Sequence, residues 1–432
     1  MVLYAHAACA CFPQAKVLKN LFRLRNYSAQ SAFLVRDARI LGIETSCDDT
    51  GVAVVDGLGN ILGESLYSQN IVHLRYGGVN PLIAHELHRN NIEQAVSDAL
   101  NRAQLDIREI AAIAVTIKPG LLISLEVGVK YAKYLSKKFH KPLIPIHHME
   151  AHALVARMYY DIPFPFLVLL ISGGHCLLSV VNDFNEFLLL GKSLDNAPGE
   201  VMDKIARRMK LRNIPEYSKM SGGRAIESAA SKAKNPDLFE FPMPLWKYKD
   251  CNFSFSGLKD SAERKLLQKE SEHSVIGDGI IPEVNDLCAA FQLAIAEHLA
   301  LRTERAIIFS EKNNFISSAR NRNIVVSGGV ACNNFIFKSI QIIGDKMGYN
   351  MFRPPPKLCT DNGIMIAWNG IEKLRKQYHL LFDNHEIICL YLRAGLPLAQ
   401  GVILTCDTSR FRASVRSSAF KDRRKIWAAM LE

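Results

Sequence analysis

Two histidines four residues apart, in His148-Met-Glu-Ala-His152, have the spacing in this sequence that is best suited to chemistry. On a helix, side chains at positions i and i+4 share one face, so both imidazoles could reach one metal ion. A pair of capping or surface histidines is the competing interpretation. Asp361 is a further candidate ligand, although a carboxylate at the start of a predicted helix can equally cap that helix. Two histidines and one aspartate would leave coordination positions open, as a catalytic metal requires.

Glu150 distinguishes this segment from the zinc peptidase pattern His-Glu-x-x-His, in which the glutamate directly follows the first histidine. Here Glu150 stands two residues after His148 and two before His152. At about 100° per residue it would point away from the face that the histidines share. A metallopeptidase is therefore an alternative that the spacing disfavours.

Small and polar residues mark several turns after strand-like runs. Asp48 and Asp49 stand side by side, and paired carboxylates suit base chemistry or cation binding, although aspartate is also a common turn residue. Glycine pairs at Ser172-Gly-Gly174, Ser221-Gly-Gly223 and Ser327-Gly-Gly329 would let the backbone approach a ligand closely. Together they favour a nucleotide site, but neither a Walker A motif nor a dinucleotide fingerprint is present.

Basic and aromatic residues gather in three segments of the second half. The predicted helix Asp203–Arg212 is rich in lysine and arginine, which could bind RNA phosphates or form a solvated face. Trp246–Lys249 and Phe253–Lys259 combine aromatic residues with lysines. Such residues can stack on bases, and they can equally belong to a loop packed on the core.

The elements that would position these residues recur in two halves. In the first half we expect a strand, polar turn and strand over Leu41–Val55, followed by a strand at Ile61–Tyr67, a helix at Pro81–Arg102, a strand at Ile110–Ile117, a helix at Leu121–Lys138, a strand at Leu143–His147 and a helix at Met149–Tyr160. In the second half we expect a hairpin over Phe166–Val181, a strand at Glu186–Leu190, helices at Glu200–Leu211, Arg224–Ala233, Leu258–Glu270 and Pro282–Glu311, a strand at Asn323–Ser327, and helices at Asn333–Ile343 and Asp361–Gln377.

This internal repeat is the strongest indication of fold. Each half opens with a hairpin whose turn is small and polar, and two such hairpins facing one another would form a phosphate-binding cleft. The pattern predicts an α/β, two-lobed fold of the actin, Hsp70 and sugar-kinase type, with duplicated hairpin-containing lobes around a central cleft. Two unrelated hairpins in an α/β protein would produce the same pattern.

Composition places the chain among ordinary globular proteins. Its 432 residues are 49% hydrophobic, and no apolar run approaches the roughly 18 residues that span a bilayer. The ten cysteines form no CxxC pair, which disfavours a cysteine zinc site or a thioredoxin-type redox site. The formal net charge of +11 weakly favours a polyanionic partner.

The first 36 residues are typical of a mitochondrial transit peptide, because they carry lysines and arginines but no Asp or Glu. A secretory signal is the alternative, but a basic segment before its apolar stretch is missing.

Eight motifs in order resemble the tRNA N(6)-adenosine threonylcarbamoyltransferase family, formerly called the O-sialoglycoprotein endopeptidase family. They are LGIETSCDDTGVAVVD, HHMEAH, LLISGGH, GEVMDKIAR, SGGRAIE, FSFSGLK, VVSGGVACNN and CTDNGIMIAWNG, spread over residues 40–370. With its leader, the chain looks similar to the mitochondrial members. The resemblance implies transfer of a threonylcarbamoyl group from threonylcarbamoyl-AMP, made by a separate synthase, to the N(6) amine of an adenosine beside the anticodon of mitochondrial tRNA.

The resemblance also implies roles for individual residues. It implies one divalent metal cation, iron or zinc, bound by His148, His152 and Asp361. It assigns the acidic pair Asp48 and Asp49 to catalysis. It assigns the nucleotide and acyl site to Leu170, Ile171, Ser172, Gly173, Gly174, Asp203, Gly223, Glu227, Cys332 and Asn333.

Several positions depart from the family pattern. Lys118 stands where glycine is typical, Ala151 replaces a usual glycine, and the resemblance fades after Gln377.

We divide the chain into a transit peptide (1–36), lobe I (37–147), lobe II (148–377) and a divergent tail (378–432). Lobe II carries the metal and nucleotide site, and its last helix could pack back on lobe I. We expect a matrix enzyme that is a monomer or homodimer and lacks a membrane span. A non-catalytic nucleotide-binding scaffold is the further alternative.

Overall fold

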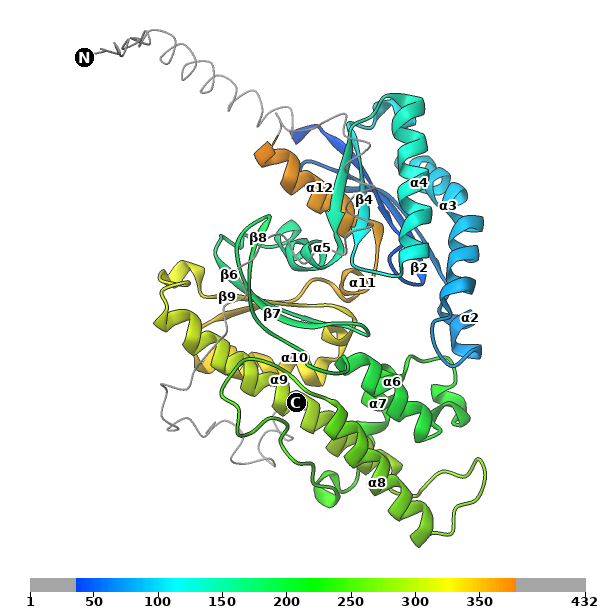
Figure 1. Ribbon diagram of the computed structural model, residues 1–432, viewed down its shortest axis with the longest axis vertical. Helices are drawn as coiled ribbons and strands as arrows, with labels where there is room; N and C mark the ends of the chain where they lie inside the picture. The colour runs from blue at the N-terminus through cyan, green and yellow to red at the C-terminus, as the bar shows by residue number, and fades with distance from the viewer. Residues whose placement is uncertain (1–35, 378–432) are drawn as a thin grey trace, which may run out of the picture.

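The computed structural model describes residues 36–377, and these form two lobes, each built on its own five-stranded sheet (Figure 1). The predicted transit peptide, except for Arg36, and the predicted tail lie outside the described residues. No helix within 36–377 has the length and apolarity needed to cross a bilayer.

The first sheet has the strand order β3-β2-β1-β4-β5. Its strands are β1 (Arg39–Glu44), β2 (Asp49–Asp56), β3 (Ile61–Ser68), β4 (Ala112–Lys118) and β5 (Leu143–His147). The first three pair antiparallel, whereas β4 and β5 continue the sheet in parallel from β1.

The second sheet repeats this arrangement, with the order β8-β7-β6-β9-β10. Its strands are β6 (Phe166–Ile171), β7 (Cys176–Asp183), β8 (Glu186–Lys192), β9 (Asn323–Ser327) and β10 (Asn350–Phe352). Here too an antiparallel meander of three strands is extended in parallel from its first strand. The matching order confirms the predicted duplicated two-lobed α/β fold.

Helices cover both faces of each sheet (Figure 1). The outer face of the first sheet packs on α3 (Pro81–Ala103) and α4 (Leu122–Phe139), and the second sheet packs on α6 (Pro198–Arg208), α7 (Gly222–Ala230), α9 (Val284–Lys312) and α10 (Asn334–Lys346). The remaining named α-helices are α2 (Asn70–Arg75), α5 (His148–Leu154), α8 (Ser256–Glu272), α11 (Pro356–Cys359) and α12 (Gly363–Gln377).

The short helix α5 lies between the two sheets and belongs to both cores (Figure 1). Ala151 packs with the inner face of the first sheet, whereas Met149 and Leu154 pack with the second. The last helix, α12, packs on the first sheet, so it lies against lobe I although it follows lobe II in the sequence. Gly42 permits this contact, because a Cβ there would lie 2.3 Å from the Gly363 carbonyl oxygen.

The expected elements agree closely with the observed ones, with three differences. The helix expected over Met149–Tyr160 is α helical only to Leu154 and continues as a 3-10 turn to Met158. The expected helix that starts at Asp361 instead begins at Gly363. The short elements α2, β10 and α11 were not expected, because segments of three to six residues carry too little periodicity to identify.

Candidate active site and metal centre

A cavity of about 580 Å³ lies between the lobes. Lobe I contributes the turn after β1, the α2 segment and the loop after β4. Lobe II contributes the turn after β6 and one side of α6. Among the residues with a predicted role, Asp48, His148, Ser172, Gly173, Gly174, Asp203 and Asp361 line this cavity.

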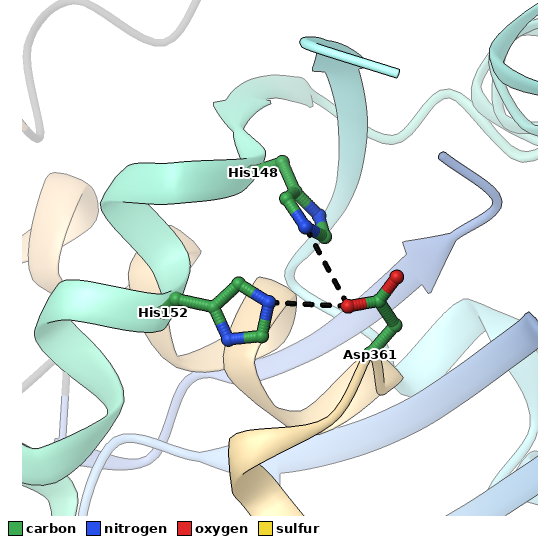
Figure 2. A group of neighbouring side chains, drawn as sticks. All are labelled: His148, His152 and Asp361. Atoms are coloured by element: carbon green, nitrogen blue, oxygen red, sulfur yellow. Dashed lines mark hydrogen bonds and ion pairs between the residues drawn. The ribbon is translucent and has the colours of Figure 1, made fainter. Parts of the chain in front are cut away.

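His148, His152 and Asp361 converge on one point (Figure 2). The Nε2 atoms of His148 and His152 lie 3.5 Å and 3.1 Å from Asp361 Oδ1, and the two imidazole rings are 4.6 Å apart. Their potential ligand atoms all lie within 4.8 Å of one another. Both histidines are buried, at 7% and 2% exposure, and their ring nitrogens face the side chains of Ser46, Glu44 and Asp361, so they are neither surface nor capping residues.

The neighbouring Asn362, not Asp361, caps the last helix. The Asn362 Oδ1 accepts a hydrogen bond from the N–H of Met365 at 2.8 Å, which is the usual geometry of an N-cap. The Asp361 carboxylate is thereby left to face the histidines. The metal-ligand role and the helix-capping role, both open for Asp361 in the sequence, are thus divided between Asp361 and Asn362.

Glu44 and Ser46, at the end of β1, support His148 from behind. Glu44 Oε2 lies 3.1 Å and Ser46 Oγ 3.2 Å from His148 Nδ1. A hydrogen bond from Nδ1 to a carboxylate leaves the lone pair of Nε2 available to a metal, as is common at metal sites. Sequence reasoning missed both residues, since a buried Glu at a strand end was the only available signal.

The charges around this cluster balance one another. Burial lowers the pKa of His148, but the Asp361 and Glu44 carboxylates outweigh it and raise that pKa to about 9. Burial raises the pKa of Asp361, but attraction to His148 and the hydrogen bond from His152 hold it well below its usual value. Two nitrogen ligands and one carboxylate with a supporting carboxylate behind fit a borderline divalent cation such as zinc or iron.

Glu150 points away from this cluster, as its spacing predicts. Its carboxylate lies 3.5 Å from the Lys373 ammonium on α12 and is nearly buried. Burial raises the pKa of Glu150, while Lys373 opposes that rise. Glu150 therefore joins α5 to α12 and is not placed as the base of a peptidase.

The acidic pair is divided between two environments. Asp48 lines the cavity, whereas Asp49 begins β2 and does not. Burial and repulsion from Asp48 raise the pKa of Asp49 to about 7, although hydrogen bonds from Ser68 and Gln69 oppose the rise. At neutral pH the pair therefore does not carry two full negative charges.

The glycine turn after β6 offers an open backbone to the cavity. A Cβ added at Gly173 or Gly174 would meet no atom within 4 Å. The N–H groups of Gly174 and His175 point to Ser172 Oγ, at 3.3 Å and 3.0 Å. His175 also lines the cavity and was not identified from the sequence, although it directly follows the glycine pair.

Two of the predicted nucleotide ligands hold helix starts. Burial raises the pKa of Asp203, and hydrogen bonds from the N–H groups of Gly222 and Gly223 oppose that rise. Burial likewise raises the pKa of Glu227, whose Oε1 accepts from the N–H of Asn334 at 2.7 Å. Of these two carboxylates, only Asp203 also lines the cavity.

The other predicted contacts do not line the cavity. Leu170 and Ile171 are core residues of β6. Asn333 is buried and caps α10, accepting from the Ile336 N–H at 3.0 Å and donating to Gln292 at 2.8 Å. The half-buried Cys332 donates its thiol to the Pro356 carbonyl.

The α6 region places three basic residues beside the carboxylates Glu200 and Asp203 on the cavity, and this was expected only in part. Lys204, Arg207 and Arg212 line the cavity from the α6 region. Arg207 donates to the Gly77 carbonyl oxygen, and Arg212 donates to that of Leu74 at 2.7 Å. The basic segment predicted from the sequence therefore links lobe II to the α2 segment of lobe I, which sequence reasoning did not assign to the site.

Comparison with known proteins gives a consistent result. The family model for tRNA N6-adenosine threonylcarbamoyltransferase matches residues 60–368. The chain is 50% identical over 364 residues to the mitochondrial tRNA N6-adenosine threonylcarbamoyltransferase of Rattus norvegicus, covering 84% of this chain and 87% of that protein. It is 43% identical over 360 residues to the Anaplasma marginale tRNA N6-adenosine threonylcarbamoyltransferase, covering 83% and 98%.

Comparison with solved structures finds matches at low sequence identity. Full-length HypF in its phosphate- and nucleotide-bound form aligns with a TM-score of 0.48 and 13% identity, over 79% of this chain and 47% of that one. The fold assignment rests on the duplicated strand order, and the family assignment rests on the sequence matches. The chain belongs to the tRNA N6-adenosine threonylcarbamoyltransferase family.

Proposed function

We propose that this chain transfers the threonylcarbamoyl group of threonylcarbamoyl-AMP to the N(6) amine of the adenosine 3′ to the anticodon, in mitochondrial tRNAs that read codons beginning with A. The product is N(6)-threonylcarbamoyladenosine. Family membership and one geometric observation support this. A single cavity is lined by His148 and Asp361 of the metal cluster and by the Ser172–Gly174 turn, and His152 lies against Asp361.

One divalent cation, iron or zinc, would be held by His148, His152 and Asp361. When bound, it would supply a Lewis acid that stabilises negative charge on donor oxygens. The nearby Glu44 would keep the His148 ring oriented.

The residues of the chain have two remaining tasks, which are positioning and proton removal. An adenine amine is a weak nucleophile, so orienting it against the donor carbonyl contributes much of the acceleration. The open backbone at Gly173 and Gly174 suits close approach of the donor phosphate, and Asp203 suits the ribose hydroxyls. Asp48 would accept the amine proton, because it is the member of the acidic pair that faces the cavity.

The cellular setting follows from the relatives. Relatives in rat and human are named as mitochondrial proteins, which supports a mitochondrial location. We infer a matrix enzyme that receives its donor from a separate synthase, acts as a monomer or homodimer, and binds tRNA through phosphate contacts.

Transfer of labelled threonylcarbamoyl from threonylcarbamoyl-AMP to mitochondrial tRNA tests the proposal. Protein lacking residues 1–36 should transfer the label, and the His148→Ala/His152→Ala variant should not. Asp48→Ala should lower turnover at saturating donor. If the first protein binds ATP and tRNA but never transfers the group, the chain is a nucleotide-binding scaffold and the proposal is wrong.

A further inference from the structure

Four consecutive exposed residues, Trp246 to Lys249, alternate aromatic and lysine side chains on the surface of lobe II. Trp246 is 67% and Tyr248 62% exposed, although large aromatic rings normally contribute to a core. Neither residue lines the cavity between the lobes. The Phe253–Lys259 segment differs, since Phe253 and Phe255 are fully buried and pack around His298.

A buried arginine fixes the backbone beneath these exposed rings. Arg302 on α9 is fully buried, and its guanidinium donates to the carbonyl oxygens of Leu245 at 2.7 Å, Tyr248 at 3.0 Å and Asp250 at 2.6 Å. Arg305, one turn later, also donates to the Tyr248 carbonyl. The turn is therefore held from inside the protein by charged donors, and its rings are not needed to hold it.

The turn itself adopts a backbone conformation that other residues must maintain. Leu245 has φ of +51°, in the left-handed region that side chains with a Cβ seldom adopt. The Tyr248 N–H donates to the Leu245 carbonyl at 3.0 Å and closes the turn. Unfavourable backbone conformations persist where the surroundings fix them, and they are common at binding sites.

The charge around the rings favours an anionic partner. The Lys247 ammonium lies 5.3 Å from the centre of the Trp246 ring, and Lys249 follows Tyr248. The one carboxylate in the turn, Asp250, is half-buried and paired with Arg302 at 3.4 Å. Alternating rings and ammonium groups match single-stranded nucleic acid, whose bases stack on aromatic faces while lysines contact phosphates.

The chain that follows the turn is hydrogen-bonded to the segment that precedes α6. The Leu194 N–H donates to the Phe253 carbonyl, and Asp195 accepts from the N–H of Phe255. Residues 193–196 lead directly into α6, which carries the cavity residues Asp203 and Lys204.

We propose that Trp246 and Tyr248, with Lys247 and Lys249, form a stacking platform for unpaired bases of the RNA substrate. This rests on the proposed function, because that function supplies an RNA partner. The platform would contribute to RNA affinity and would not touch the reacting atoms.

Tryptophan fluorescence offers a direct test on the full chain. The sequence has three tryptophans, of which Trp368 is buried and Trp427 can be replaced by phenylalanine. In the Trp427→Phe protein, an anticodon stem-loop RNA should quench the exposed Trp246, whereas heparin, a polyanion without bases, should not. Trp246→Ala and Tyr248→Ala should each weaken RNA binding about tenfold, whereas Trp246→Phe should retain most of the parent protein's RNA affinity.

The controls separate stacking from charge and from misfolding. Ile276→Ala, at a position that is 89% exposed, should leave RNA affinity unchanged. Lys247→Gln/Lys249→Gln should flatten the salt dependence of binding. Equal quenching by heparin, unchanged RNA affinity in Trp246→Ala, or binding of a protein partner in place of RNA would each overturn the stacking platform. If the chain transfers the threonylcarbamoyl group in any of these cases, the proposed function still stands. If the unmodified chain neither binds RNA nor transfers, both proposals fail.

Discussion

Adjacent residues at the start of the last helix have different tasks. Asp361 faces the histidines, while Asn362 caps α12. We therefore expect Asp361→Asn to abolish stoichiometric metal binding with little loss of folding stability. Asn362→Ala should retain the metal but lose about 1 kcal/mol of unfolding free energy, the usual effect of removing an N-cap. Metal analysis and urea unfolding of both variants check this, and equal metal loss in the two would contradict it.

Asp49 makes stability depend on pH. Burial and repulsion from Asp48 raise its pKa from 3.8 to about 7 in the folded protein. The folded state therefore binds more protons than the unfolded state between these values, so stability falls as pH rises from about 4 to 7. The loss is at most about 4 kcal/mol at 1.36 kcal/mol per pKa unit.

Asp49→Asn should remove this dependence. Urea unfolding at pH 5 and pH 7 should show a smaller difference in unfolding free energy for the variant than for the parent protein. A parent protein that is equally stable at both pH values would exclude the raised pKa.

At the residue scale, sequence reasoning found side-chain types but not their burial. The spacing of His148 and His152 sufficed to predict a shared helix face, and both imidazoles do face Asp361. The sequence could not reveal that Asn333 would cap a helix or that Glu227 would hold the start of α10, because both depend on how distant segments meet. For the same reason it could not show that Glu44 would lie behind His148.

At the element scale, the approach of α12 to the first sheet depends on Gly42. A Cβ there would lie 2.3 Å from the Gly363 oxygen and 2.4 Å from the Ala367 nitrogen. Gly42→Ala should therefore displace α12, which follows Asp361, and cost about 3 kcal/mol by overpacking. Metal content should fall as well.

The matched control is Gly173→Ala, whose added Cβ would meet nothing within 4 Å. That variant should unfold at the parent urea concentration. Thermal or urea unfolding with metal analysis compares the two variants, and a Gly42→Ala protein of parent stability would show that the contact relaxes freely.

Most elements could be predicted because their patterns are long. The helix Pro81–Ala103 and the hairpins at the start of each half carry clear periodicity and turn residues. The three-stranded meander in each half also predicted the duplicated fold. The pairing of β10 and the position of α2 could not be predicted, since such short segments gain stability only from tertiary contacts.

At the scale of the whole molecule, Arg207 and Arg212 link the lobes across the cavity. Arg207 donates to the Gly77 carbonyl of lobe I, whereas its neighbour Arg208 pairs with Glu270 within lobe II. Arg207→Gln should let the lobes separate and reduce kcat/KM for the donor about tenfold. Arg208→Gln should leave donor kinetics near the parent values. Steady-state kinetics with varied donor distinguish the two, and identical effects would rule out a specific link between lobes.

The helix α5, which carries both histidines, also affects how the protein is degraded in a cell. Because α5 supplies side chains to the cores of both lobes, it cannot leave one core without disrupting the other. The lobes should then unfold together in one cooperative transition, and forms with one intact lobe should be rare. A protease that degrades damaged chains would therefore encounter either the fully folded protein or a fully unfolded chain. Few half-folded forms would remain that bind tRNA without modifying it.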